Sequence, residues 1–123
     1  MTSWRRRLAA DPRLPQVALR VRDYLHDRIG HDIGVDELAQ LAAVDRFRLN
    51  RAFKAAFGLP PHACLIQLRL SRARQRLAHG QAVAEVAADL GFADQSRLGR
   101  WFRRAYGFTP AQYVRRCTNR PDR

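Results

Sequence analysis

Apolar residues recur along most of the chain at the spacing of amphipathic helices. The first stripe predicts a helix that starts near Pro15 and ends at Gly30. It consists of four residues spaced four apart: Val17, Val21, Leu25 and Ile29. A second, shorter helix is expected from Asp36 to about Ala43, because acidic residues favour a helix N-terminus.

The next segment predicts a longer helix with two distinct faces. Asp45 is a candidate N-terminal cap and Gly58 a candidate terminator. One face is apolar, with Leu49, Ala52, Phe53 and Ala56. The opposite face is mainly polar and cationic, with Phe47, Asn50, Arg51 and Lys54.

A long helix follows, and the short-helix, long-helix pattern then recurs. Two prolines permit a helix start, and an amphipathic stretch of about 61–79 leads to Gly80. After it come a short helix that ends at Gly91, a second helix capped by Asp94, and a last turn or two over "TPAQYVRR". In that second helix the apolar face is Leu98, Trp101, Phe102 and Ala105, and the opposed face is Ser96, Gly99, Arg100 and Arg103.

The two halves of the chain match each other position by position. Glu37 and Ala39 recur 48 residues later as Glu85 and Ala87. In the helix that follows, Leu49, Arg51, Phe53 and the terminator Gly58 recur 49 residues later as Leu98, Arg100, Phe102 and Gly107, so the extra residue falls in the turn. We therefore expect an all-α fold with a duplicated two-helix unit and no strand. The expected parts are a basic leader or linker remnant (1–14), a first unit (about 15–59), a linker helix (about 61–79), a second unit (about 82–116) and a tail (117–123).

The charge of the chain indicates what kind of partner it binds. The 123 residues, enough for one compact core or two small ones, carry 23 basic against 11 acidic side chains, a net charge of +12. Residues 46–57 and 95–106 each hold four cations and no acid, which is eight of the twelve net charges. A solvated helix face normally mixes signs, so the pattern indicates a polyanion, with nucleic acid favoured over an anionic membrane surface.

Several other functions find little support in the sequence. No apolar run is long enough to span a membrane and no secretory signal is recognisable, so we expect a cytoplasmic protein. The four histidines are scattered, and Cys64 and Cys117, read as reduced thiols, belong to no metal-binding cluster, so neither metal nor cofactor is expected. No nucleophile and base share a recognisable spacing, and helix-start charge accounts for the matched Glu37 and Glu85, so catalysis is not expected.

A short helix, a turn and a longer basic helix describe a helix-turn-helix, whose second helix enters the major groove of DNA. Planar side chains that make two hydrogen bonds can read bases, and an aromatic ring can contact a thymine methyl. The base-contact candidates of these types are Phe47, Asn50, Arg51, Gln95 and Arg100. The phosphate-contact candidates, which position the protein without reading sequence, are Arg48, Lys54, Arg97, Arg103 and Arg104.

Four motifs, "ELAQLAAVDRFRLNRAFKAAFG", "RLSRAR", "VAEVAADLGFADQSRLGRWFRRAYG" and "GFTPAQYVRR", carry a family resemblance. Residues from about 15 to 116 resemble the DNA-binding domain of the AraC/XylS family of bacterial transcription regulators. The resemblance implies seven helices with two helix-turn-helix units joined by a linker helix. It also implies that Phe47, Asn50, Arg51, Gln95, Ser96 and Arg100 face adjacent major-groove segments of operator or promoter DNA in the nucleoid, and makes RNA polymerase a candidate second partner.

The chain also departs from the family pattern. Pro60 and Cys64 stand where the family usually has a hydroxyl residue and an aromatic, and Gly99 replaces a side chain that often faces DNA. No effector or dimerisation domain is expected in these 123 residues, which makes the chain a short stand-alone member or a fragment. The alternative function is nonspecific nucleic-acid binding, as in a nucleoid-associated protein or an RNA chaperone. The operator, any effector and the choice between activation and repression stay open.

Overall fold

The structure is a computed structural model that describes residues 13–118, and these form helices and no strand, as predicted. The chain divides into two compact units. The N-terminal unit contains residues up to Arg28 together with Asp32–Ile66, and the C-terminal unit contains Ile29–His31 together with residues from Gln67 onward. The predicted leader up to residue 12 and the predicted tail beyond Thr118 lie outside the described residues.

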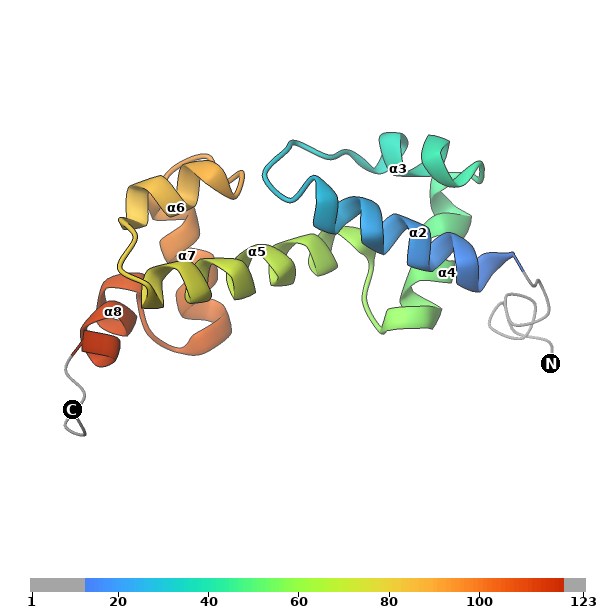
Figure 1. The fold of residues 1–123 in the computed structure, drawn as a ribbon. Coiled ribbons are helices and arrows are strands. Elements are labelled where there is room, and N and C mark those ends of the chain that lie inside the picture. Colours follow the sequence, from blue (N-terminus) through green and yellow to red (C-terminus); the bar gives the residue numbers. More distant parts are fainter. Residues whose placement is uncertain (1–12, 119–123) are drawn as a thin grey trace. The chain divides into compact units, whose positions relative to one another are not determined.

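In the N-terminal unit, α2 (Leu14–Asp27) packs against both α3 (Val35–Ala42) and α4 (Arg46–Phe57), and the two shorter helices meet at a corner (Figure 1). The predicted apolar stripe of α2 is buried as far as Leu25. Ile29 does not continue it, because Arg28 has already left the helical region of backbone dihedral space. The predicted end of this helix at Gly30 was therefore two to three residues too late.

The turn between α3 and α4 requires a left-handed backbone at Ala43, whose φ is 58°. Its matched position in the C-terminal unit is Gly91, with φ 83°. Glycine adopts this conformation freely, whereas an L-residue with a Cβ is strained there by about 1 kcal/mol or more. The two turns thus share a geometry that the sequence expresses with different residues.

Both ends of α4 follow the predicted chemistry. The Asp45 carboxylate accepts a hydrogen bond of 2.8 Å from the Arg48 backbone N–H, and Gly58 ends the helix with φ 83°. Leu49 and Phe53 are fully buried. Ala56, which was predicted to be buried, is exposed because Phe57 takes the inner position of the last turn, its ring 4.7 Å from that of Phe53.

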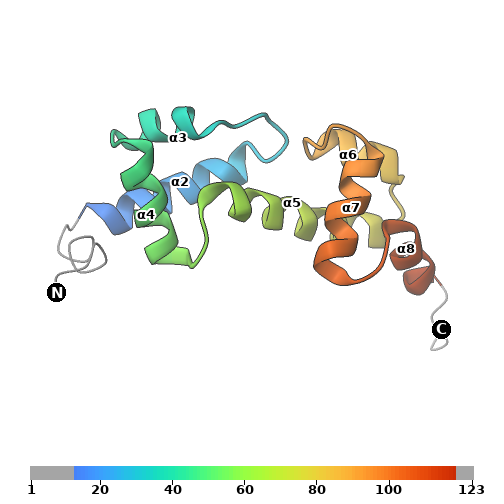
Figure 2. The same cartoon turned by 180° about the vertical axis from the view of Figure 1, so that it is seen from behind.

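The C-terminal unit contains α6 (Val83–Asp89), α7 (Gln95–Tyr106), α8 (Pro110–Thr118) and most of α5 (Pro61–Ala78), which the sequence predicted as a separate linker. Figure 2 shows α7 meeting α6 at a corner, as α4 meets α3. Asp94 caps α7 by accepting a 2.8 Å hydrogen bond from the Arg97 backbone N–H. Gly107 ends α7 with φ 85°.

Phe102 lies at the centre of an aromatic cluster that joins α7 to α8. Its ring centroid is 4.8–6.3 Å from three other rings, those of Tyr106, Tyr113 and Phe108. As at Ala56 in α4, Ala105 is exposed although it was predicted to be buried, because the aromatic residue after it takes the inner position. The last turns were predicted too short: α8 extends through Thr118 and starts with reciprocal hydrogen bonds between Thr109 and Gln112, a capping box.

Arg69, the first residue of "RLSRAR", is a buried cation inside the C-terminal unit, with only 8% of its surface exposed. Its guanidinium donates hydrogen bonds of 2.8 Å to the carbonyls of Ile29 and His31, and a longer one of 3.4 Å to that of Gly91. A Cβ at Gly30 would lie 2.3 Å from the Asp89 carbonyl oxygen. Arg69 and the close approach at Gly30 together hold residues 29–31 against the turn that follows α6.

We expect Arg69→Met to lower the free energy of unfolding by about 2–4 kcal/mol, because the carbonyls it satisfies lose charge-assisted hydrogen bonds. Urea denaturation followed by circular dichroism measures the change. Arg72→Met is the matched control on an exposed position of the same helix, where about 0.5 kcal/mol or less is expected. Equal stabilities of the two variants would contradict the structural role of Arg69.

Candidate nucleic-acid interface

The exposed face of α4 lies opposite its buried Leu49 and Phe53. Phe47 is 62% exposed, which is unusual for a large apolar side chain. Arg48 and Lys54 are exposed on the same helix. Three of the predicted contact residues therefore lie on the open surface of α4.

Arg51 is half-buried and its guanidinium carbon lies 4.0 Å from the centroid of the Phe47 ring. A guanidinium over an aromatic face gains about 0.5–1 kcal/mol at an exposed site. The contact favours an arrangement in which the two side chains stack. The structure therefore brings these two base-contact candidates together.

Asn50 differs from the other candidates of α4. It is half-buried and lines a hollow of about 420 Å³ inside the N-terminal unit, beside Val35, Pro60 and His62. This position is at the edge of the exposed face and not on it. Of the six predicted base-contact residues, Asn50 has the weakest structural support.

All the predicted contact residues of α7 are exposed. They are Gln95, Ser96, Arg97, Arg100, Arg103 and Arg104. Gly99 is half-buried, yet apart from its chain neighbours and its own helix backbone no atom lies within 4 Å of the place where a Cβ would stand. The absent side chain at this position therefore leaves open space beside the cationic face.

Trp101 is not in the core, contrary to the prediction from its spacing. It is half-exposed, and the guanidinium carbon of Arg104 lies 5.2 Å from the centroid of its indole. With Arg97, Arg100 and Arg104 it lines an open hollow of about 340 Å³. Leu98 and Phe102 define the buried side of α7, and one residue turns a helix by about 100°, so Trp101 falls at the edge of that side.

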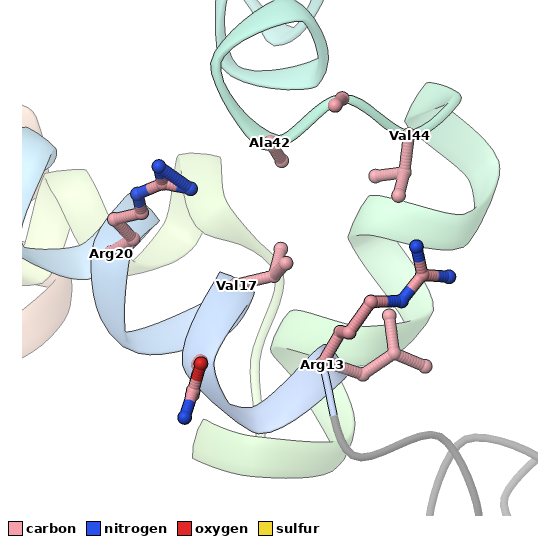
Figure 3. Close-up of a pocket in the computed structure, with 8 residues that line it drawn as sticks. Arg13, Val17, Arg20, Ala42 and Val44 are labelled. Atoms are coloured by element: carbon pink, nitrogen blue, oxygen red, sulfur yellow. The ribbon is translucent and has the colours of Figure 1, made fainter.

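A second open hollow, of about 450 Å³, lies between α2 and the turn from α3 to α4. Figure 3 shows Val17, Ala42 and Val44 around it, with Arg13, just before α2, on one side and Arg20 of α2 on the other. Its lining contains no carboxylate, imidazole or thiol. The lining of this hollow therefore offers none of the acids, bases or nucleophiles that commonly act in catalysis.

The matched carboxylates Glu37 and Glu85 belong to different units, Glu37 to the N-terminal one and Glu85 to the C-terminal one. Glu37 accepts a hydrogen bond from the Tyr24 hydroxyl, which ties α3 to α2. This hydrogen bond, together with some burial, raises the pKa of Tyr24 above its ordinary value. The charge at the start of α3 thus has a specific partner, which the sequence did not indicate.

Within residues 13–118, no cluster of three or more histidine, cysteine or acidic side chains could hold a metal ion. The same part of the chain has no helix with the length and apolar character that a bilayer crossing requires. Cys64 is buried, and this burial raises the pKa of its thiol.

Each of the two units contains a short helix, a left-handed turn and a capped helix whose exposed face is cationic. This arrangement defines a helix-turn-helix DNA-binding protein. The family model described as a helix-turn-helix domain matches residues 38–116. The chain belongs to this family, the AraC-type helix-turn-helix domains of bacterial transcription regulators. This is a family of DNA-binding proteins and not of enzymes.

Known relatives agree with this assignment. The chain is 33% identical over 104 residues to the regulator MtrA of Neisseria gonorrhoeae, covering 84% of this chain and 33% of MtrA. It is 32% identical over 88 residues to the transcriptional activator RhaS of Escherichia coli, covering 71% of this chain and 32% of RhaS. The chain therefore spans about a third of the length of these relatives.

A solved structure is similar as well. The DNA-binding domain of AdpA, a global transcriptional factor whose structure was determined with a target DNA, superposes with a TM-score of 0.71 at 32% identity. The match covers 93% of this chain and all of that chain. The predicted family and the all-α fold class are thus confirmed.

We expect Phe102→Ala and Trp101→Ala to differ sharply in stability. Removing the buried ring at the centre of the aromatic cluster should cost about 3–5 kcal/mol of unfolding free energy, whereas removing the edge indole should cost about 1 kcal/mol or less. Urea titrations of both variants measure the difference. If the Trp101 variant were as unstable as the Phe102 variant, Trp101 would have to be a core residue.

Proposed function

We propose that this chain is the sequence-specific double-stranded DNA-binding part of a bacterial transcription regulator, with α4 and α7 as its two recognition helices. One observation carries the proposal: the same turn of each helix places an arginine, the half-buried Arg51 or the exposed Arg100, on the side opposite a buried leucine and phenylalanine. Arginine hydrogen-bonds guanine with two parallel bonds in the major groove.

The proposed roles follow from position on each helix. Phe47 and Arg51 in α4, and Gln95, Ser96 and Arg100 in α7, would contact bases, since they lie on exposed first turns or opposite the core. Asn50 is proposed only as a contact at the edge of the exposed face of α4. The phosphate contacts would be the cations at the flanks and later turns: Arg48, Lys54, Arg97, Arg103 and Arg104.

Activation is the proposed direction of regulation. It is supported by the similarity to RhaS, which is named as a transcriptional activator. RNA polymerase is then the second proposed partner, and the bacterial cytoplasm, at the nucleoid, is the proposed location. These statements concern a whole regulator. In the relatives, about two thirds of the chain lies outside the part that matches this sequence.

Nonspecific nucleic-acid binding is the second candidate function, and the net charge of +12 favours it. Charge alone attracts any polyanion, so the two candidates differ in the role of Arg100 and not in the presence of binding.

We expect Arg100→Ala to weaken binding to a duplex selected from random DNA by about 1–3 kcal/mol, and binding to unrelated duplex much less. Fluorescence anisotropy of labelled duplexes at constant salt measures both affinities. Arg72→Ala removes the same charge from an exposed position on α5 and serves as the control. An equal loss on selected and unrelated DNA would favour the nonspecific candidate.

We also expect affinity to fall steeply with salt. Each neutralised phosphate contributes about −0.9 to the slope of log K against log salt, so five phosphate contacts predict a slope of roughly −4 to −5. Titrations at several salt concentrations measure it. A flat response would contradict the electrostatic basis of the proposed function.

A further inference from the structure

We propose that the hollow beside Trp101 is a DNA strand contact, in which the indole packs on a deoxyribose and the arginines on the same flank, Arg97 and Arg104, bind the adjoining phosphate. The proposal rests on the proposed DNA binding and adds to it a residue, Trp101, that the charge pattern did not select. It also names which part of the nucleic acid that residue meets.

The first argument is the composition of the hollow. Its lining consists of Arg97, Arg100, Trp101 and Arg104, so three guanidinium groups surround one aromatic ring in a volume of about 340 Å³. All three arginines are exposed. A lining with three cations and no acid favours an anion, and the anion that α7 would meet is a phosphodiester.

The second argument is the exposure of the indole. Phe102, at the centre of the aromatic cluster, is fully buried, whereas Trp101 is half-exposed and has the guanidinium of Arg104 near its ring. An indole offers a flat apolar surface and one N–H donor. A sugar with its attached phosphate presents the complementary pair, an apolar ring beside an anionic acceptor.

The third argument is the place of the hollow on α7. Arg97, Trp101 and Arg104 are spaced four and three residues apart and share one flank of the helix, while Ser96 and Arg100 lie more nearly opposite the core. When a recognition helix lies in the major groove, its outer face meets base edges and its flanks meet the strands that border the groove. A strand held at this flank would fix the register of Arg100 on the bases.

The fourth argument is that the feature is absent from the matched helix. The position that corresponds to Trp101 in α4 is Ala52, which is buried, and the position that corresponds to Arg104 is Ala55. The indole and the arginine that line the hollow on α7 therefore have no counterparts at the matched positions of α4. The strand contact belongs to α7 alone, which makes the two recognition helices unequal.

Tryptophan fluorescence tests the contact directly. The chain has two tryptophans, Trp4 and Trp101, so Trp4→Phe leaves Trp101 as the only source of tryptophan fluorescence. We expect saturating duplex DNA to reduce the quenching of Trp101 by acrylamide about twofold or more, since the indole would be covered by sugar. Inorganic phosphate at the same phosphate concentration is expected to leave quenching unchanged, and protection by phosphate alone would overturn the strand contact in favour of a simple anion site.

Affinity tests it a second time. Trp101→Leu should weaken duplex binding about fivefold or more, because a tryptophan at an interface is commonly among its strongest contacts, and Trp101→Phe should recover part of the loss. Leu19→Ala, at an exposed apolar residue of α2, is the matched control and should bind as the parent does. Circular dichroism of each variant establishes that it is folded.

The outcomes separate the two proposals. If the parent binds no duplex, the proposed function fails, and the strand contact with it. If the parent binds duplex but Trp101 stays equally accessible to acrylamide, or folded Trp101→Leu binds within about 1.5-fold of the parent, only the strand contact is wrong. Protection of Trp101 together with a loss that Trp101→Phe partly recovers supports it.

Discussion

The candidate interface depends on which side of α4 and of α7 is packed against the core. Each helix is anchored by a leucine and a phenylalanine four residues apart, Leu49 with Phe53 and Leu98 with Phe102, and all four are fully buried. A helix that buries one such pair has only one side left for solvent. The arginine two residues after each leucine is thereby directed away from the core, in both units.

The same anchoring explains where the duplicated units differ. Aromatic residues at the ends of the two helices, Phe57 and Tyr106, complete the core next to the anchors, which leaves the preceding alanines exposed. The residue one step before the second anchor is a buried alanine in α4 and a half-exposed tryptophan in α7. The duplicated units thus differ on this flank: α4 has a buried alanine there, whereas α7 has an indole surrounded by arginines.

Arg69 shows a second use of arginine in a chain where most arginines are exposed. Its cation is buried and satisfied by backbone carbonyls, so it contributes to the fold of the C-terminal unit and not to its basic surface. The three residues it holds, 29–31, belong to that unit although the chain on both sides of them belongs to the other. Net charge therefore overstates the cationic surface that is available to a partner.

The sequence by itself determined the helices, their caps at Asp45 and Asp94, the duplication and the cationic faces of α4 and α7, because these depend on spacing and on residues a few positions apart. Only the tertiary structure decided that Trp101 is at the edge of the core, that Asn50 turns toward a hollow and that Arg69 binds carbonyls about 40 residues away. The reason is physical: whether a side chain at the border of an apolar stripe is covered depends on which distant segment packs beside it, and local periodicity contains no record of that neighbour.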